Sequence, residues 1–184
     1  MTAQLFLCVD PASGKSGHSG MVGLCNGDIA KTQAGYLMWT SHCPANDKNV
    51  GRYNSRYGAW HYESIAATCW SWGRHEVPVV VMEIPPLHGK TYSSSSGLLR
   101  VVGLVEEKVR SWGWNWVEVT STEAKKALTG KGTAKKEDML PAAQDHLDLK
   151  FPDQWTIKRK EAVADAVGIG VAGMNKWEKE QGRA

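Results

Sequence analysis

The sequence lacks any apolar run long enough to cross a bilayer. Its first apolar stretch, residues 5–9, is far shorter than the roughly 20 residues of a transmembrane helix. That stretch also lacks the charged flank and the small-residue cleavage site of a signal peptide. Low-complexity runs and internal repeats are absent as well. We therefore expect a folded cytoplasmic protein with no membrane partner.

Closely spaced cysteines are also missing. The four cysteines are far apart and form no CxxC pair, which argues against a zinc ribbon or a zinc finger. In a reducing compartment such residues behave as small hydrophobic side chains, so we expect them in the core. They are Cys8, Cys25, Cys43 and Cys69.

The excess of positive charge is small, because the formal net charge is only +3. The distribution of the lysines is more informative. Residues 125–136 contain several lysines and no acidic residue, and a second basic group follows at residues 158–160. Clustered cations suit a polyanion such as nucleic acid, although a solvated surface has the same composition. The lysines of the first cluster are Lys125, Lys126, Lys131, Lys135 and Lys136.

Hydrophobic periodicity predicts the secondary structure. Three early strands joined by tight turns, with Asn26-Gly27 as a hairpin signal, predict an antiparallel meander. Later strands are expected at residues 77–82 and 114–119. Helices are expected at 55–73, 98–112, 134–147 and 158–175, and Pro141 should kink or split the third of these. The early strands are expected at residues 5–9, 21–25 and about 36–40.

The resulting order, βββ-α-β-α-β-α-α, predicts an α/β fold with a mixed five-stranded sheet flanked by helices. No linker interrupts the chain, so residues 1–184 are expected to form a single domain. The last helix is rich in Ala and Gly, which allows it to lie close against the sheet. Residues 175–184 are expected to form a frayed polar tail.

Two acidic residues stand at the ends of apolar strands. Asp10 follows residues 5–9, and Glu83 follows residues 77–82. Carboxylates are rarely buried unless they are paired or bound to a metal, and sites in α/β sheets assemble at the carboxyl ends of strands. We therefore expect Asp10 and Glu83 to converge at one edge of the sheet. Taken singly, each acid also fits the role of a helix cap or a turn former.

The last predicted helix carries two more carboxylates, Glu161 and Asp165. They are four residues apart, so they lie on one helix face and repel each other. A divalent cation removes that penalty. Several carboxylates without a Cys or His framework favour Mg²⁺, or alternatively Mn²⁺, over Zn²⁺. Two such ions about 4 Å apart support phosphodiester hydrolysis.

A nucleotide-binding loop is not expected. Residues 13–16, Ser-Gly-Lys-Ser, resemble the end of a Walker A motif, but Val9 stands where the first glycine of that motif belongs. We therefore expect no nucleotide cofactor. The small residues after Asp10 are expected to form a turn that lets backbone approach the substrate.

Four blocks of the sequence resemble one family, the RuvC-type Holliday junction resolvases of the RNase H-like superfamily. Residues 7–12 resemble the family's first strand with its "GIDPG"-like ending, and residues 80–83 resemble the strand that ends in a catalytic Glu. Residues 124–136 are similar to the segment "VKKAVTGKGRADK", and residues 161–170 resemble the terminal "DAADALAIA" helix. The blocks occur in the family's order, and the third is the most specific.

The resemblance implies an RNase H-like fold and a homodimer that makes paired symmetric nicks in a four-way DNA junction. It implies that Asp10 bridges two metal ions, with Glu83 and Asp165 as further ligands. Lys125 and Lys136 match family lysines that contact DNA phosphate or assist at the scissile group, so Lys125 counts among the expected catalytic residues. Lys126 and Lys131 of the same segment complete the expected DNA-binding set.

The sequence departs from the family pattern at one position. The family places its fourth acid, or a His, three residues before the helix Asp, and this chain has Ala162 there. Glu161 lies one residue earlier, near the same helix face. We therefore expect Glu161 to serve as the fourth catalytic carboxylate and metal ligand; if it does not, three protein carboxylates remain.

Other functions compete with this reading. A YqgF-type nuclease of the same fold acts on RNA, and only a substrate assay separates the two. An actin-like or sugar-kinase-like ATPase shares a related sheet but needs a much longer chain. A junction-binding module without catalysis is the third alternative, although such a module gains nothing from acids that face phosphates.

Overall fold

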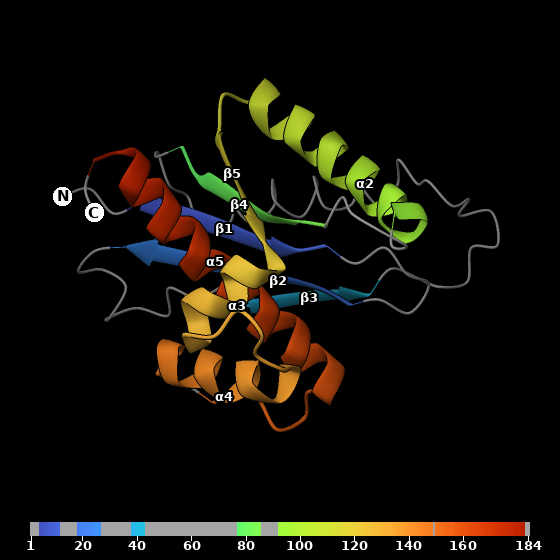
Figure 1. Cartoon of the computed structure of the whole chain (residues 1–184), viewed down its shortest axis with the longest axis vertical. Coiled ribbons are helices and arrows are strands. Elements are labelled where there is room, and N and C mark those ends of the chain that lie inside the picture. The colour runs from blue at the N-terminus through green and yellow to red at the C-terminus, as the bar shows by residue number, and fades with distance from the viewer. Residues whose placement is uncertain are drawn as a thin grey trace.

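The chain forms a five-stranded mixed sheet with helices on both faces, as its computed structural model shows (Figure 1). The strands are β1 (Gln4–Asp10), β2 (His18–Asn26), β3 (Met38–His42), β4 (Val79–Ile84) and β5 (Asn115–Thr120). The helices are α2 (Tyr92–Ser111), α3 (Ser121–Thr129), α4 (Lys136–Leu147) and α5 (Ile157–Glu180). The structure describes residues 4–11, 18–26, 38–42, 77–85, 92–148 and 150–182.

The strand order is β3-β2-β1-β4-β5. β1, β2 and β3 pair antiparallel in sequence order, which confirms the predicted meander. β4 pairs parallel with β1, and β5 pairs parallel with β4. The predicted mixed five-stranded α/β sheet is therefore confirmed, and its parallel half brings the carboxyl ends of β1, β4 and β5 to one edge.

Each strand alternates between two apolar cores. Side chains such as Phe6, Cys8 and Val81 face α5, while Leu7, Val9 and Met82 face α2. The burial of Cys8 agrees with the expected core role of the cysteines. Figure 1 shows α2 on one side of the sheet and α3, α4 and α5 on the other. The two faces of the sheet are thus covered by different helices.

Small residues let α5 lie directly on the sheet, as its composition predicted. A Cβ atom at Gly20 of β2 would overlap the carbonyl oxygen of Ala162. A Cβ atom at Gly170 would come within 2.6 Å of the Cys8 Sγ atom, and one at Gly173 would overlap the Val81 side chain. Close contact of helix and strand backbones fixes the position of α5 over the ends of β1 and β2.

Helix α3 was missed by the periodicity argument, so three helices follow β5 where two were predicted. The local signals for it were present. Thr120 caps its start: the Thr120 hydroxyl accepts a hydrogen bond from the Glu123 N–H at 3.2 Å, and the Glu123 carboxylate accepts one from the Thr120 N–H. Gly130 ends it in the left-handed conformation, with φ of 77°.

The other helix boundaries differ from expectation in places. α2 begins at Tyr92, before the first residue of its predicted apolar stripe. α4 runs unbroken through Pro141, so the expected split of that helix is wrong. α5 continues to Glu180, which corrects the expected frayed tail from residue 175. The polar residues of that last part of α5 stay helical and line a groove described below.

Some predictions fall outside the described residues. The helix expected at 55–73 and the turn after Asn26 lie there, as do the side chains of three of the cysteines, and these remain predictions. Among the helices that the structure describes, none is both long and apolar enough to span a membrane.

Candidate active site

The parallel register of β1 and β4 places the two strand-terminal acids side by side. Val9 of β1 pairs with Met82 of β4, so Asp10 and Glu83 follow as the next pair of residues. Val9 and Met82 both face α2, and successive side chains of a strand alternate. Asp10 and Glu83 therefore both face α5. The register of β1 and β4 therefore brings these two acids together at the sheet edge, as predicted.

The third acid comes from α5. Ala162 lies against Gly20, and Gly20 is the β2 partner of Asp10. Asp165 is three residues after Ala162, on the same side of the helix. Its side chain is only 23 % exposed. The close packing at Gly20 thus brings Asp165 down to the sheet edge where Asp10 and Glu83 end.

The pKa values of the three acids are all raised. Burial raises the pKa of Asp10 well above its usual range, and the carboxylates of Asp165 and Glu83 add to this effect. Burial, with a further contribution from Asp165, raises the pKa of Glu83 to about 7. Burial also raises the pKa of Asp165, with a contribution from Glu161. Each shift reports negative charge held in a poorly solvated place.

Two lysines oppose this negative charge. The Lys136 ammonium lies 3.8 Å from the Asp165 carboxylate and 3.9 Å from that of Glu161. Lys136 also lowers the pKa values of Asp10 and Glu83, and Lys125 lowers those of Glu83 and Asp165. Lys125 and Lys136 therefore stand beside the acids, where the predicted contact with a substrate phosphate requires them.

Glu161 lies at the edge of the group formed by Asp10, Glu83 and Asp165, which we call the acid cluster. It raises the pKa of Asp165 and pairs with Lys136, and its side chain is 28 % exposed. The neighbouring Ala162 is buried against Gly20, so the family's usual position points at the sheet backbone in this chain. Glu161 is thus near Asp165, as predicted, while its role as a metal ligand remains a prediction.

The remaining predicted lysines lie elsewhere. Lys126 is exposed and is one of the residues that line a groove formed by α3, β5 and the end of α5. Lys131 is exposed in the turn after α3, where its N–H donates to the Thr129 hydroxyl at 3.2 Å. The predicted DNA-binding set is therefore divided between the acid cluster, the turn and the groove.

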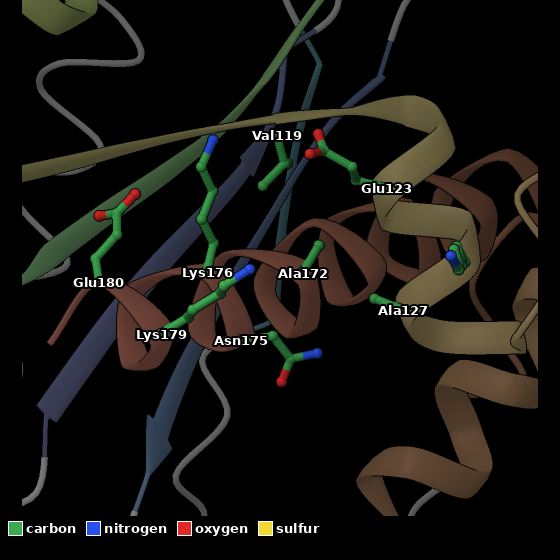
Figure 2. Close-up of a pocket in the computed structure, with 9 residues that line it drawn as sticks. Val119, Glu123, Ala127, Ala172, Asn175, Lys176, Lys179 and Glu180 are labelled. Atoms are coloured by element: carbon green, nitrogen blue, oxygen red, sulfur yellow. The ribbon is translucent and has the colours of Figure 1, made fainter. Parts of the chain in front are cut away.

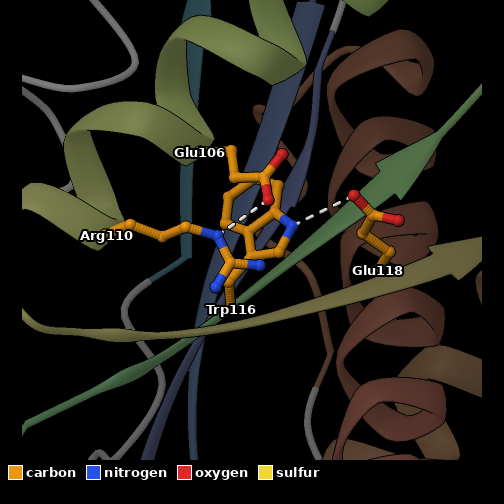
Figure 3. Close-up of polar contacts among 4 residues, drawn as sticks. All are labelled: Glu106, Arg110, Trp116 and Glu118. Carbon is orange, nitrogen blue, oxygen red and sulfur yellow. Dashed lines mark hydrogen bonds and ion pairs between the residues drawn. The ribbon is translucent and has the colours of Figure 1, made fainter.

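Not every half-buried acid belongs to the cluster. Glu118 of β5 accepts a hydrogen bond from the Trp116 indole N–H at 3.2 Å (Figure 3). Both residues lie on the α2 face, near the ion pair of Arg110 with Glu106 at 2.8 Å. Glu118 thus faces away from Asp10 and Glu83.

The acid cluster suits a hard divalent cation in its chemistry. Asp10, Glu83 and Asp165 supply the carboxylate oxygens that Mg²⁺ and Mn²⁺ take as ligands, and a cation relieves the repulsion among them. With the side chains as they stand, the described part of the chain contains no group of three Asp, Glu, His or Cys residues close enough to hold a metal. The fit therefore rests on donor chemistry and charge.

The strand order and the mixed strand directions are those of an α/β fold of the RNase H-like type. Two solved structures of RuvC from Thermus thermophilus share it. One has a TM-score of 0.65 at 16 % identity, and the other, in complex with a Holliday junction substrate, has 0.63 at 14 %. Each comparison covers 98 % of both chains, so the whole chain has a RuvC-like fold. No protein-family model and no curated protein sequence matches the chain.

The structure thus brings together Asp10, Glu83, Asp165, Glu161, Lys125 and Lys136, all of which the sequence had singled out. Sequence reasoning missed Gly20, whose missing side chain admits α5, and it missed Lys176 and Lys179 in the groove of Figure 2. No local signal marks the two lysines, because their grouping with Lys126 depends on how α3 packs on α5.

Proposed function

We propose that this protein is a metal-dependent endonuclease that cleaves four-way (Holliday) or otherwise branched DNA. The observation that carries the proposal is the convergence of Asp10, Glu83 and Asp165, whose pKa values are all raised by burial and by neighbouring carboxylates, at the carboxyl edge of a RuvC-like fold. One similar structure, RuvC of Thermus thermophilus, holds a Holliday junction substrate, which supports DNA junctions as the substrate class.

In this proposal Asp10, Glu83 and Asp165 hold Mg²⁺ or Mn²⁺, with Glu161 as a further ligand at the rim. If bound there, a pair of such ions would supply Lewis-acid chemistry for phosphodiester hydrolysis. The chain's own contribution is to bring the carboxylates to one edge of the sheet. Burial, with a further contribution from neighbouring carboxylates, raises the pKa values of Asp10 and Glu83, and a cation bound there would relieve that repulsion.

Lys125 and Lys136 position the scissile phosphate. Both lie near enough to the acids to lower the pKa values of Glu83 and Asp165. Lys136 pairs with Glu161 and Asp165 and is otherwise largely solvent-exposed. An ammonium group beside the carboxylates attracts the substrate phosphate that the carboxylates alone would repel.

Paired symmetric nicks need two equivalent sites, so we propose that the protein acts as a homodimer on the junction. A two-fold symmetric dimer presents the same site to two strands of a four-way junction. A junction-binding module without catalysis is disfavoured, because it would keep three repelling acids at the phosphate surface without using them.

The experiment is incubation with end-labelled four-way, forked and linear duplex DNA, and with the matching RNA, each with Mg²⁺ or with EDTA. We expect Mg²⁺-dependent, symmetrically placed nicks in the four-way DNA and much slower cleavage of linear duplex. Faster cleavage of RNA than of DNA junctions would assign the protein to an RNA-processing role. Equal cutting of all DNA forms would contradict branch selectivity.

A further inference from the structure

A second polar surface lies beyond the acid cluster. It is an open groove of about 1020 Å³ between α3, β5 and the last turns of α5 (Figure 2). Three lysines, Lys126, Lys176 and Lys179, give it a basic rim, and we call it the lysine groove. Its other lining residues are Val119, Glu123, Ala127, Ala172, Asn175 and Glu180.

The lysine groove and the acid cluster share one side of α5. Ala172, Lys176 and Lys179 follow Asp165 by 7, 11 and 14 residues, spacings that return to the same face of a helix. α3 crosses α5 between them: a Cβ atom at Gly168 would lie 3.2 Å from the Ala124 carbonyl oxygen. The acids therefore lie on one side of the crossing and the lysine groove on the other.

The distance between the two surfaces suits a DNA arm. At 1.5 Å per residue, Lys179 lies roughly 21 Å along the helix axis from Asp165. Successive phosphates of one strand advance by about 3.4 Å along a duplex, so this span corresponds to roughly six nucleotides. Helix α3 contributes a lysine to each surface: Lys125 lies beside the acid cluster, and its neighbour Lys126 lines the groove.

The charges of the groove favour an anion. Within the described residues, the exposed side chains of Lys126 and Lys179 have no ion-pair partner. Lys176 donates to the Glu118 carbonyl oxygen at 3.0 Å, which keeps its ammonium group at the groove. Of the two lining acids, Glu123 accepts hydrogen bonds from the Thr120 N–H and hydroxyl and also interacts with the charge of Lys176. With Glu180 as the second acid, the lining still has three lysines against two carboxylates.

We propose that the lysine groove binds the phosphate backbone of a DNA arm that leaves the acid cluster, about six nucleotides from the cleaved bond. This inference rests on the proposed function and extends its DNA surface to Lys176 and Lys179. The inference favours substrates with long duplex arms. A DNA end shorter than about six nucleotides would contact the acid cluster without reaching the lysine groove.

The test compares wild type with Lys179→Gln and with Lys126→Gln/Lys179→Gln in EDTA, so that the DNA stays intact. Fluorescence anisotropy measures binding to a four-way junction over a range of salt. Each lost phosphate contact flattens the slope of log K against log salt by about 0.9, so the double variant should lose roughly 1 to 2 and bind roughly tenfold more weakly at 0.1 M salt. Hydroxyl-radical footprinting should show protection about six nucleotides from the cut site in wild type, and the double variant should lose it.

The control is Lys108→Gln/Lys150→Gln, which removes the same charge from α2 and from the segment after α4. Circular dichroism melting checks that every variant folds. If the groove variant keeps the slope and footprint of the control, the groove does not bind DNA. If polyglutamate binding is lost in the double variant while its DNA slope and footprint match the control, the groove takes an acidic protein segment instead, and this also overturns the proposal.

Failure of the groove is distinguishable from failure of the proposed function. If wild type cleaves junctions and only the groove variants behave as the control, the nuclease assignment stands and the extended surface falls. If wild type neither prefers nor cuts branched DNA, both fall.

Discussion

At the scale of single residues, the acids of the cluster reduce stability where they stand. Burial and the neighbouring carboxylates raise the pKa values of Asp10, Glu83 and Asp165, so ionising them in the folded chain is unfavourable. Lys125 and Lys136 offset part of this repulsion. Such an arrangement is typical of functional sites, where charge is kept for its chemistry at the expense of stability.

The pH dependence of stability follows from Glu83. Its pKa rises from 4.5 to about 7 on folding, so the folded protein binds the proton more tightly than the unfolded chain. The associated stabilisation is complete below pH 4.5 and is lost as the pH rises through about 7. Without divalent ions, Glu83→Gln should therefore be more stable than wild type at pH 8 by about 1 to 3 kcal/mol, and similar to it at pH 5. Denaturant unfolding in EDTA measures both values.

Glu107→Gln is the matched control, because Glu107 is exposed on α2 and distant in sequence from the cluster. It should follow the wild-type curve at both pH values. A Glu83→Gln curve that also runs parallel to wild type would mean that Glu83 is not held among repelling charges.

At the scale of secondary-structure elements, the position of α5 determines whether the cluster exists. Its Ala and Gly residues bring the helix backbone onto β1, β2 and β4, and Asp165 reaches the sheet edge only through that approach. The helix therefore supplies Asp165 and also positions it against the sheet edge. Its fit on the sheet is tightest at Gly20.

Gly20→Ala should disturb this approach. The added Cβ atom would overlap the Ala162 carbonyl oxygen, and both groups are backbone or backbone-attached, so α5 must move. We expect a loss of about 1 to 3 kcal/mol of stability, together with a loss of cleavage that exceeds the loss of folded protein. Thermal melting and cleavage of a four-way junction measure the two effects.

Gly103→Ala is the control for this substitution. Gly103 lies in α2, and a Cβ atom there meets nothing within 4 Å, so the change should stabilise the helix by about 0.5 to 1 kcal/mol. If Gly20→Ala reduces neither stability nor cleavage relative to Gly103→Ala, the close packing of α5 on β2 does not determine the position of Asp165.

The elements show what the sequence can and cannot predict. The strands that end at Asp10 and Glu83 were predictable, because an apolar run followed by an acid is a local pattern. α3 was not predicted, although Thr120, Glu123 and Gly130 are typical capping residues for a helix of this length. Its apolar pattern is weak, and its lysines were interpreted as a DNA-binding segment. The lysine groove could not be predicted from the sequence, because it forms only where α3 packs against α5, and no local sequence pattern encodes that packing.

At the scale of the whole molecule, the likeness to RuvC is a likeness of fold. The chain aligns along 98 % of its length with Thermus thermophilus RuvC at only 16 % identity. The resemblance noted in the sequence was therefore concentrated in the strand ends, the basic segment and the last helix. These are the parts that meet at the acid cluster.

The substrate surface that we propose crosses the molecule from the acid cluster over α3 to the lysine groove. A two-fold dimer would carry two such surfaces, one for each strand that is cut. The net charge of +3 is modest, so binding should depend on where the lysines stand more than on overall attraction.

The most direct measurement compares wild type with Asp10→Asn on one labelled four-way junction, following binding in EDTA and cleavage in Mg²⁺. We expect cleavage to fall at least about a hundredfold, the scale seen when one transition-state-stabilising group is removed. Junction binding should stay equal or tighten, because a carboxylate that repels phosphate has been neutralised. An Asp10→Asn protein that cuts as fast as wild type would contradict the assignment of the acid cluster as the nuclease centre.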